Sequence, residues 1–149
     1  KEVMALDELP RNVHLQLESD ALLKGIESEL HSVASNLITN AVKYTPAEGE
    51  IELRWWIDDA GAHLSVRDTG VGIAEEHIPR LTERFYRVDP GRARSMGGSG
   101  LGLAIVKHAL QRHDATLEIK SKEGVGSTFT CHFPRTRVIP RSTGVLATA

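Results

Sequence analysis

Apolar and polar residues follow one another along the chain in two kinds of pattern, and each pattern predicts one kind of element. Residues 12–18 (NVHLQLE) alternate between the two classes, which is typical of a strand with one buried face. From Glu27 to Tyr44 apolar residues recur at helical spacing, and the proline and glycine of 45–49 (TPAEG) end that helix. Alternating segments joined by short turns predict two hairpins: 50–58 with 62–70, and 115–121 with 127–134.

The remaining segments complete the order of elements. Residues 75–85 predict one or two short helices, and residues 101–112 predict a longer one. Between them, 87–98 contains Pro, Gly and three arginines without periodicity, and loops of that length are usually functional lids or disordered. Strands come in hairpin pairs with helices between them, which predicts an α+β layered sandwich. We expect one domain over 1–135 and a disordered tail over 136–149.

Composition and charge narrow the class of protein. The chain has 149 residues, 40% hydrophobic and 26% charged, which suits one soluble globular domain with a real core. A net charge of −2 gives no basic footprint for nucleic acid, and no apolar run is long enough to span a bilayer. The single cysteine, Cys131, excludes an internal disulfide and is expected to be a buried thiol in a strand. Because the sequence starts without methionine, we expect it to be a piece of a longer protein.

Four glycines crowd into residues 97–102, where a helix is about to begin. Glycine costs conformational entropy, and at a helix N-terminus it lets backbone N–H groups approach an anion such as phosphate. A flexible connection would explain the same cluster. The spacing is G-x-G-x-G and an arginine-rich loop precedes it, so the dinucleotide-binding fingerprint, which needs G-x-G-x-x-G after a strand, is excluded.

Polar residues form a stripe along the first predicted helix, beside its apolar face. Asn36, Asn40, Lys43 and Tyr44 recur at spacings that place them on one side. An amide oxygen can ligate Mg²⁺, and a lysine one turn further could meet phosphate. The alternative is a half-exposed helix shoulder whose asparagines bond to backbone.

Asp68 follows a predicted strand in the motif DTGVG. It could cap the next turn, or it could read a base, because a carboxylate only accepts hydrogen bonds and therefore suits the exocyclic amine of adenine. Gly70 and Gly72 would let a flat ring approach the backbone. A further glycine pair in GVGSTF (124–129) fits simple turn chemistry equally well.

Taken in order, the motifs NLITNAVKYT, DTGVG, ERFYRVD, GGSGLGL and GVGST resemble the N, G1, F, G2 and G3 boxes of sensor histidine kinases. That family belongs to the ATPase superfamily shared with DNA gyrase, Hsp90 and MutL. The resemblance covers about residues 12–134, and HIPRLTERFYRVD and GGSGLGLAIVKHAL are most similar to phosphate-regulon sensor kinases. It implies a two-layer α/β sandwich (Bergerat fold), with a mixed, mostly antiparallel sheet of about five strands on three helices and a long ATP lid.

The resemblance also implies a site for ATP and Mg²⁺. Asn40 would ligate Mg²⁺, Lys43 and Arg87 would contact phosphate and share the catalytic role with Asn40, Asp68 would read adenine, and Leu101 would close over the nucleotide. The full set of residues carried over is Asn36, Asn40, Lys43, Tyr44, Asp68, Gly70, Gly72, Ile73, Tyr86, Arg87, Gly98, Gly100, Leu101, Gly102 and Thr128.

Three positions carry further expectations from the resemblance. Thr128 would form part of the pocket floor. Thr82 stands where the F box usually has phenylalanine, and Ile26 stands where an acidic residue commonly precedes the long helix. Neither departure touches the expected metal or base site.

Histidine kinases also need a phosphoacceptor histidine, followed by an acidic residue and, a few places on, a proline. None of the seven histidines has that context, so the chain is expected to be the catalytic half alone. Its partners would be the dimerisation and phosphoacceptor helices of the same parent and a response regulator. The resemblance implies a cytoplasmic domain, with no direct membrane contact of its own, whose parent is anchored in a bacterial inner membrane.

Two other functions stay open at this point. ATPase switches of the gyrase or Hsp90 type need a glutamate as general base, usually near the magnesium-binding asparagine. The residue four before Asn40 is Asn36, which argues for a kinase. A non-catalytic module that binds nucleotide or a partner protein is the second alternative.

Overall fold

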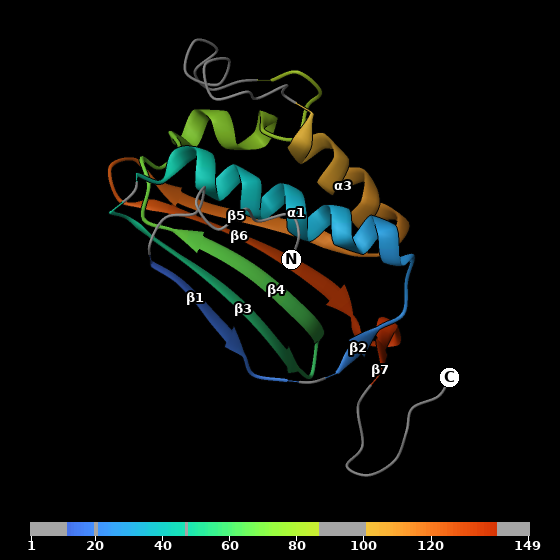
Figure 1. The fold of residues 1–149 in the computed structure, drawn as a ribbon. Coiled ribbons are helices and arrows are strands. Elements are labelled where there is room, and N and C mark those ends of the chain that lie inside the picture. Colours follow the sequence, from blue (N-terminus) through green and yellow to red (C-terminus); the bar gives the residue numbers. More distant parts are fainter. Residues whose placement is uncertain (1–11, 20, 47, 87–100, 140–149) are drawn as a thin grey trace.

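The computed structural model describes residues 12–19, 21–46, 48–86 and 101–139, and it shows an α+β sandwich of two layers (Figure 1). The central sheet has the strand order β1-β3-β4-β6-β5. Strand β1 runs parallel to β3, and every other neighbouring pair is antiparallel. The strands span Asn12–Leu17 (β1), Glu50–Asp58 (β3), Gly61–Asp68 (β4), Thr116–Lys122 (β5) and Gly126–Pro134 (β6).

Helices cover one face of this sheet. Helix α1 spans Glu27–Tyr44 and α3 spans Gly102–Arg112, and the two lie side by side across the strands (Figure 1). The apolar stripe predicted for α1 is buried at Val33, Leu37 and Ala41. The core between the layers is completed by side chains from both helices and the inner strands: Val106, Leu110, Ile51, Val66, Phe129 and Cys131. The predicted helix, both hairpins and the buried thiol of Cys131 are thereby confirmed, and burial raises the pKa of that thiol to about 12.

The segment expected to be helical over 75–85 forms only a short 3-10 helix, η2, over Glu75–Arg80. Pro79 lies inside it and has no backbone N–H to donate, so the i→i−4 bonding of an α-helix cannot continue through this point. Residues 81–85 follow in turns, and Phe85 has a positive φ of 68°. The prediction of one or two short helices over 75–85 is thus met by a single 3-10 helix over Glu75–Arg80, and residues 81–85 are not helical.

The tail expected to be disordered from 136 onward begins with ordered structure, which corrects that expectation. Arg135–Arg137 form a 3-10 turn, η3, and Val138–Ile139 form strand β7, which pairs with β2 (Leu22–Leu23). Strands of two residues are too short to show an apolar period, which is why the sequence did not reveal them. Residues 140–149 and the expected lid, 87–98, lie outside the described part of the chain.

The other face of the sheet carries no helix among the described residues, and its charges are paired along the strands. Arg54 donates to Glu18 at 2.5 Å, and Arg67 donates to Glu52 at 3.3 Å. Because these charges neutralise one another, the open face has the character of a solvated surface. No helix in the described ranges is long and apolar enough to cross a membrane.

Candidate functional site

Three of the predicted motifs meet at one end of the sandwich. The N–H of Val71, in the DTGVG motif, donates to the carbonyl of Tyr44 at the end of α1 (3.3 Å). The carbonyl of Val71 accepts from the N–H of Gly124, in the turn between β5 and β6 (2.8 Å). The C-terminal end of α1, the loop after β4 and the last hairpin therefore form one contiguous region.

Asp68 is the last residue of β4 and lies in this region, only 5% exposed. Its Oδ1 accepts a hydrogen bond from the N–H of Gly70 at 2.9 Å. Burial raises the pKa of Asp68 above its ordinary value, while the backbone N–H groups of Gly70 and Ser127 and the positive charge of Arg67 act in the opposite direction. No salt bridge reaches its carboxylate within the described ranges. An acid whose pKa is raised by desolvation is a candidate for a functional site.

The glycines of the DTGVG motif allow the chain's own backbone to come together. A Cβ on Gly70 would lie 2.0 Å from the carbonyl oxygen of Tyr44. Gly72 has a φ of +73°, and its Cβ would lie 2.1 Å from the carbonyl oxygen of Lys122. Both positions therefore need glycine for packing of the motif, and approach of a nucleotide ring to them stays a prediction.

Ser127 is the hairpin residue that shares the side of Asp68. The two pair directly across β4 and β6, so their side chains lie on the same face of the sheet. Ser127 is buried, and its Oγ lies 2.8 Å from the Oγ of Ser121, which in turn accepts from the N–H of Ile73 at 2.7 Å. Ile73 is thereby held against the hairpin.

Thr128, which the sequence resemblance assigned to the pocket floor, is not brought to Asp68. It pairs with Arg67 in β4 and with Lys120 in β5, on the open face of the sheet. The sequence held a signal for this difference. Side chains alternate along a strand, so Ser127 shares the face of the buried Phe129 and Thr128 does not.

The polar stripe of α1 leads from the middle of that helix to the same end of the sandwich. Asn36 donates from Nδ2 to the carbonyl of Ser32 at 2.8 Å, as the helix-shoulder alternative expects. Asn40 is half-buried, and its amide makes no hydrogen bond with any described residue. Lys43 and Tyr44 are half-buried as well. Only Asn40 thus combines partial burial with a side-chain amide that no described neighbour uses.

The start of α3 lies beside this stripe. A Cβ on Gly102 would come within 3.0 Å of Asn36 Oδ1, so the amide oxygen of Asn36 faces the first turn of α3. Leu101, the residue before the helix, is half-buried and provides no side-chain cap. The unpaired N–H groups of a helix start are suited to an anion.

Three residues of the predicted site lie outside the part of the chain that the structure describes. They are Arg87, Gly98 and Gly100, so their position relative to Asp68 stays a prediction. Their neighbour Tyr86 is described. Its hydroxyl hydrogen-bonds to Nδ1 of His77, and the guanidinium of Arg80 lies 4.6 Å from the centre of its ring. Tyr86 is therefore held by η2 and the turn that follows it.

The donor atoms of this region suit a magnesium ion that is held mainly by phosphates and water. Mg²⁺ prefers oxygen ligands and usually keeps several waters, and Asn40 offers one unused amide oxygen. The described residues contain no group of three or more His, Cys, Asp or Glu that could hold a metal by themselves. An ion here would depend on its nucleotide for the remaining ligands.

One buried hydroxyl in the region lacks a partner. Thr45 follows Tyr44 directly, is 7% exposed, and its Oγ1 makes no hydrogen bond. Its Cγ2 lies 2.5 Å from where a Cβ on Gly49 would stand, beside the hydroxyl of Thr69. A buried hydroxyl without a hydrogen-bond partner costs about 1–3 kcal/mol. A ligand, or a water bound with it, would supply the missing partner of Thr45.

Comparison with known proteins gives a consistent result. Residues 25–137 match the family model described as "Histidine kinase-, DNA gyrase B-, and HSP90-like ATPase". The phosphate regulon sensor protein PhoR of Pseudomonas aeruginosa is 67% identical over 116 residues, 78% of this chain and 26% of that protein. PhoR of Haemophilus influenzae is 42% identical over 142 residues, 95% of this chain and 33% of that protein. The chain thus spans a third or less of the length of these relatives.

Solved structures give the same picture for the fold. The mycobacterial sensor histidine kinase MprB aligns with a TM-score of 0.77 and 29% identity, covering 91% of this chain and 87% of that one. Full-length ShkA, solved in complex with AMPPNP, aligns with a TM-score of 0.70 and 28% identity, covering 88% of this chain and 26% of that one.

Proposed function

Since the chain belongs to the family of histidine kinase-, DNA gyrase B- and HSP90-like ATPases and is a catalytic domain of the histidine kinase type, we propose that it binds Mg-ATP and donates the γ-phosphate to a histidine on a separate dimerisation helix. That helix would belong to the same parent, a sensor kinase of the PhoR type. The phosphoryl group would then pass to an aspartate of a response regulator. We place the domain in the cytoplasm and the anchor of its parent in the bacterial inner membrane.

The observation that carries the proposal is Asp68, a buried carboxylate whose pKa is raised by burial and which forms no salt bridge with any described residue. When ionised it can only accept hydrogen bonds, so it suits the exocyclic amine of adenine and repels the carbonyl oxygen that guanine carries there. Ser127 on the same face and the orphaned hydroxyl of Thr45 offer further hydrogen-bonding groups, directly or through water.

The residues of α1 would act on the phosphates. A bound Mg²⁺ would supply positive charge at the phosphate oxygens, and Asn40 is the residue that would ligate it. Lys43, and Arg87 beyond the described part, would offset the remaining negative charge. Catalysis by such a site rests on positioning and charge neutralisation, and closure of the segment before Gly102 would exclude water, whose attack competes with transfer.

Hydrolysis as the primary function finds less support. The side chain four residues before Asn40 is the amide of Asn36, which donates to the carbonyl of Ser32. An amide cannot take a proton from water as a carboxylate can. The structure therefore favours transfer to an acceptor over activation of water.

The test of this function is phosphotransfer to a supplied acceptor. The chain is mixed with radiolabelled ATP and Mg²⁺, alone and with a dimeric helix fragment of its parent that contains the acceptor histidine. We expect label on the fragment only. Acid-labile label on the chain alone would mean that one of its own histidines is an acceptor. Nucleotide binding without any transfer to the fragment would instead support a non-catalytic binding module.

A further inference from the structure

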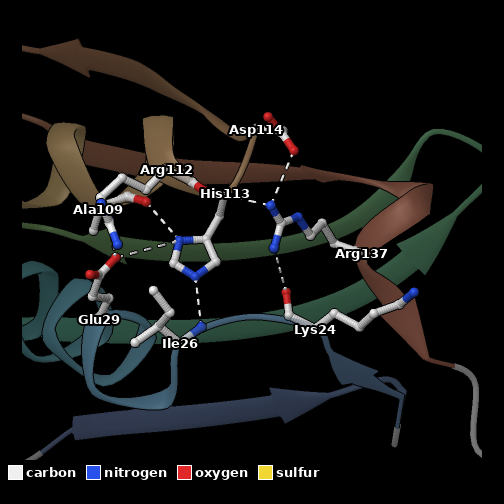
Figure 2. Close-up of polar contacts among 8 residues, drawn as sticks. All are labelled: Lys24, Ile26, Glu29, Ala109, Arg112, His113, Asp114 and Arg137. Carbon is white, nitrogen blue, oxygen red and sulfur yellow. Dashed lines mark hydrogen bonds and ion pairs between the residues drawn. The ribbon is translucent and has the colours of Figure 1, made fainter. Parts of the chain in front are cut away.

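His113 lies at the end of α3 remote from the predicted nucleotide site, and it joins that helix to the start of α1 (Figure 2). The residue is 1% exposed. Nδ1 donates to the carbonyl of Ala109, one turn earlier in α3, at 2.8 Å. Nε2 accepts from the backbone N–H of Ile26, the residue that begins α1, at 2.9 Å. One ring therefore bridges two helices that are 87 residues apart in sequence.

The two hydrogen-bond partners of the ring determine which of its nitrogens carries the hydrogen. A carbonyl can only accept, so Nδ1 must carry a hydrogen, and a backbone N–H can only donate, so Nε2 must carry the lone pair. These hydrogen bonds thus select one tautomer of His113, with the hydrogen on Nδ1. The bond also gives a partner to the backbone N–H of Ile26, the N-cap residue of α1, whose side chain makes no capping hydrogen bond.

The surroundings of His113 are closely packed and are linked to one another by polar contacts. A Cβ on Gly25 would lie 2.4 Å from Cδ2 of the ring, so the ring fills the space that this glycine leaves. Arg112 donates to Glu29 of α1 at 2.9 Å, and Arg137 donates to the carbonyl of Lys24 at 3.2 Å (Figure 2). Polar contacts thereby tie the entry to α1, the end of α3 and the segment after β6 to one another.

The same two helices carry both halves of the proposed nucleotide site at their other ends. The C-terminal half of α1 bears Asn40 and Lys43, whereas the first turn of α3, with Gly102, faces Asn36. The seam between the helices is made of apolar side chains such as Val33, Leu37 and Val106. Apolar packing is non-directional, so a directional hydrogen bond at one end is a means to set how far α3 lies along α1.

We infer that His113 is a positioning residue for the nucleotide site. Through its bond to Ile26 it sets the register of α3 against α1, and thereby places the first turn of α3 beside Asn36 and Asn40. The inference rests on the proposed binding of Mg-ATP. It concerns the γ-phosphate end above all, because the part of the site that α3 contributes is the helix start that would face the phosphates.

Two substitutions separate the two hydrogen bonds of the ring. In His113→Gln, the amide oxygen reaches the position of Nε2 and can still accept from Ile26. In His113→Asn, the amide nitrogen reaches the position of Nδ1 and can donate only to Ala109. His108→Gln is the matched control, because His108 is exposed on the same helix. Affinities for Mg-ATP and Mg-ADP are measured by calorimetry at a temperature at which circular dichroism shows each variant folded.

We expect His113→Asn to weaken Mg-ATP binding about threefold to tenfold, the equivalent of one hydrogen bond, and to weaken Mg-ADP binding less. His113→Gln should restore most of the loss, and His108→Gln should bind as the wild type does. Equal affinities for the Asn and Gln variants would overturn the inference, since a purely structural role would not depend on which bond is kept. Absence of ATP binding by the wild type would count against the proposed function itself.

A measurement on the unaltered chain covers the case in which His113→Asn does not fold. Hydrogen exchange of the Ile26 amide is followed with and without Mg-ATP. If the bond to His113 is coupled to the site, exchange of this amide should slow when nucleotide binds at the far end of the helices. Identical exchange rates in the two conditions would contradict the inference.

Discussion

Asp58 and Asp68 lie at opposite ends of the hairpin formed by β3 and β4, and their environments are opposite as well. Asp58 accepts from Nε2 of His63 at 2.8 Å and from the N–H of Ala60 at 2.9 Å, and these hydrogen bonds lower its pKa. Asp68 is buried, and burial raises its pKa. The same residue type is thus stabilised in its charged form at one end of the hairpin and penalised in that form at the other.

Other acids on the open face of the sheet resemble Asp58 in having a basic partner. On the open face Glu18, Glu52 and Glu118 each lie within 3.3 Å of a basic side chain. These carboxylates of the open face are therefore paired with basic side chains. Asp68, in contrast, lies where the end of α1, the DTGVG motif and the last hairpin converge. A buried acid with a raised pKa at such a junction is a candidate for a binding role.

The largest expected effect comes from removing each carboxylate in turn. Asp68→Ala should weaken Mg-ATP binding roughly tenfold to a hundredfold, because a hydrogen bond to a charged group is worth about 1.5–3 kcal/mol. Asp58→Ala should leave the affinity unchanged, since Asp58 lies at the far end of the hairpin. Calorimetry on both variants checks this. Equal losses would show that the contrast between the two residues has no functional meaning.

A smaller difference is expected between neighbours on the two faces of β6. Ser127→Ala should weaken Mg-ATP binding about fivefold, through loss of one neutral hydrogen bond near Asp68. Thr128→Ala, the matched control, should bind as the wild type does because Thr128 pairs with Arg67 on the open face. Weaker binding by Thr128→Ala than by Ser127→Ala would mean that Thr128 forms the pocket floor and that the nucleotide lies in a different position.

The dependence of stability on pH should have opposite slopes for the two acids. The pKa of Asp68 is raised from the ordinary 3.8, so just above that value the folded chain holds a proton that the unfolded chain has lost. Its contribution to the free energy of unfolding therefore falls as pH rises through this window. Asp58 has a lowered pKa, so its contribution is present above 3.8 and is lost as pH falls through the folded value.

Denaturant titrations between acidic and neutral pH distinguish these slopes. Asp68→Asn has no proton to lose. The free energy of unfolding of this variant should therefore increase relative to that of the wild type as pH rises above 3.8. Asp58→Asn should lose stability relative to the wild type as pH rises toward 3.8 from below, because only the wild type gains a charged partner for His63 there. A gain for Asp58→Asn, or a loss for Asp68→Asn, would mean that burial is not what distinguishes the two acids.

Much of this fold could be predicted from the sequence because its main elements have strong local periods. Helix α1 ends where TPAEG indicates, and both hairpins form at the predicted segments. The failures have local causes too. Pro79 limits the segment after Glu75 to a 3-10 helix, and the two-residue strands β2 and β7 are too short to leave a pattern. Their pairing depends on contacts between distant parts of the chain.

The candidate site was predicted unevenly for the same reason. Asp68 stands out in the sequence because it ends a strand directly before glycines, and the structure shows that it is buried. Ser127 was missed because its value comes from register with β4, although counting alternation back from Phe129 would have found it. His113 gave no local signal, since its partner Ile26 is 87 residues away. Motifs thus indicated the candidate site, whereas pairing across the fold determined which of the described residues lie on the same face as Asp68.

The claim that Asp68 reads adenine is tested most directly by comparing ATP with GTP. Affinities of the wild type and of Asp68→Asn for the magnesium complexes of both nucleotides are measured by calorimetry under one set of conditions. We predict that the wild type prefers ATP roughly tenfold to a hundredfold, because the carboxylate of Asp68 can accept from the amine of adenine and meets only an oxygen on guanine. Asp68→Asn, which can also donate, should lose most of that preference. Comparable affinities of the wild type for ATP and GTP would contradict the account.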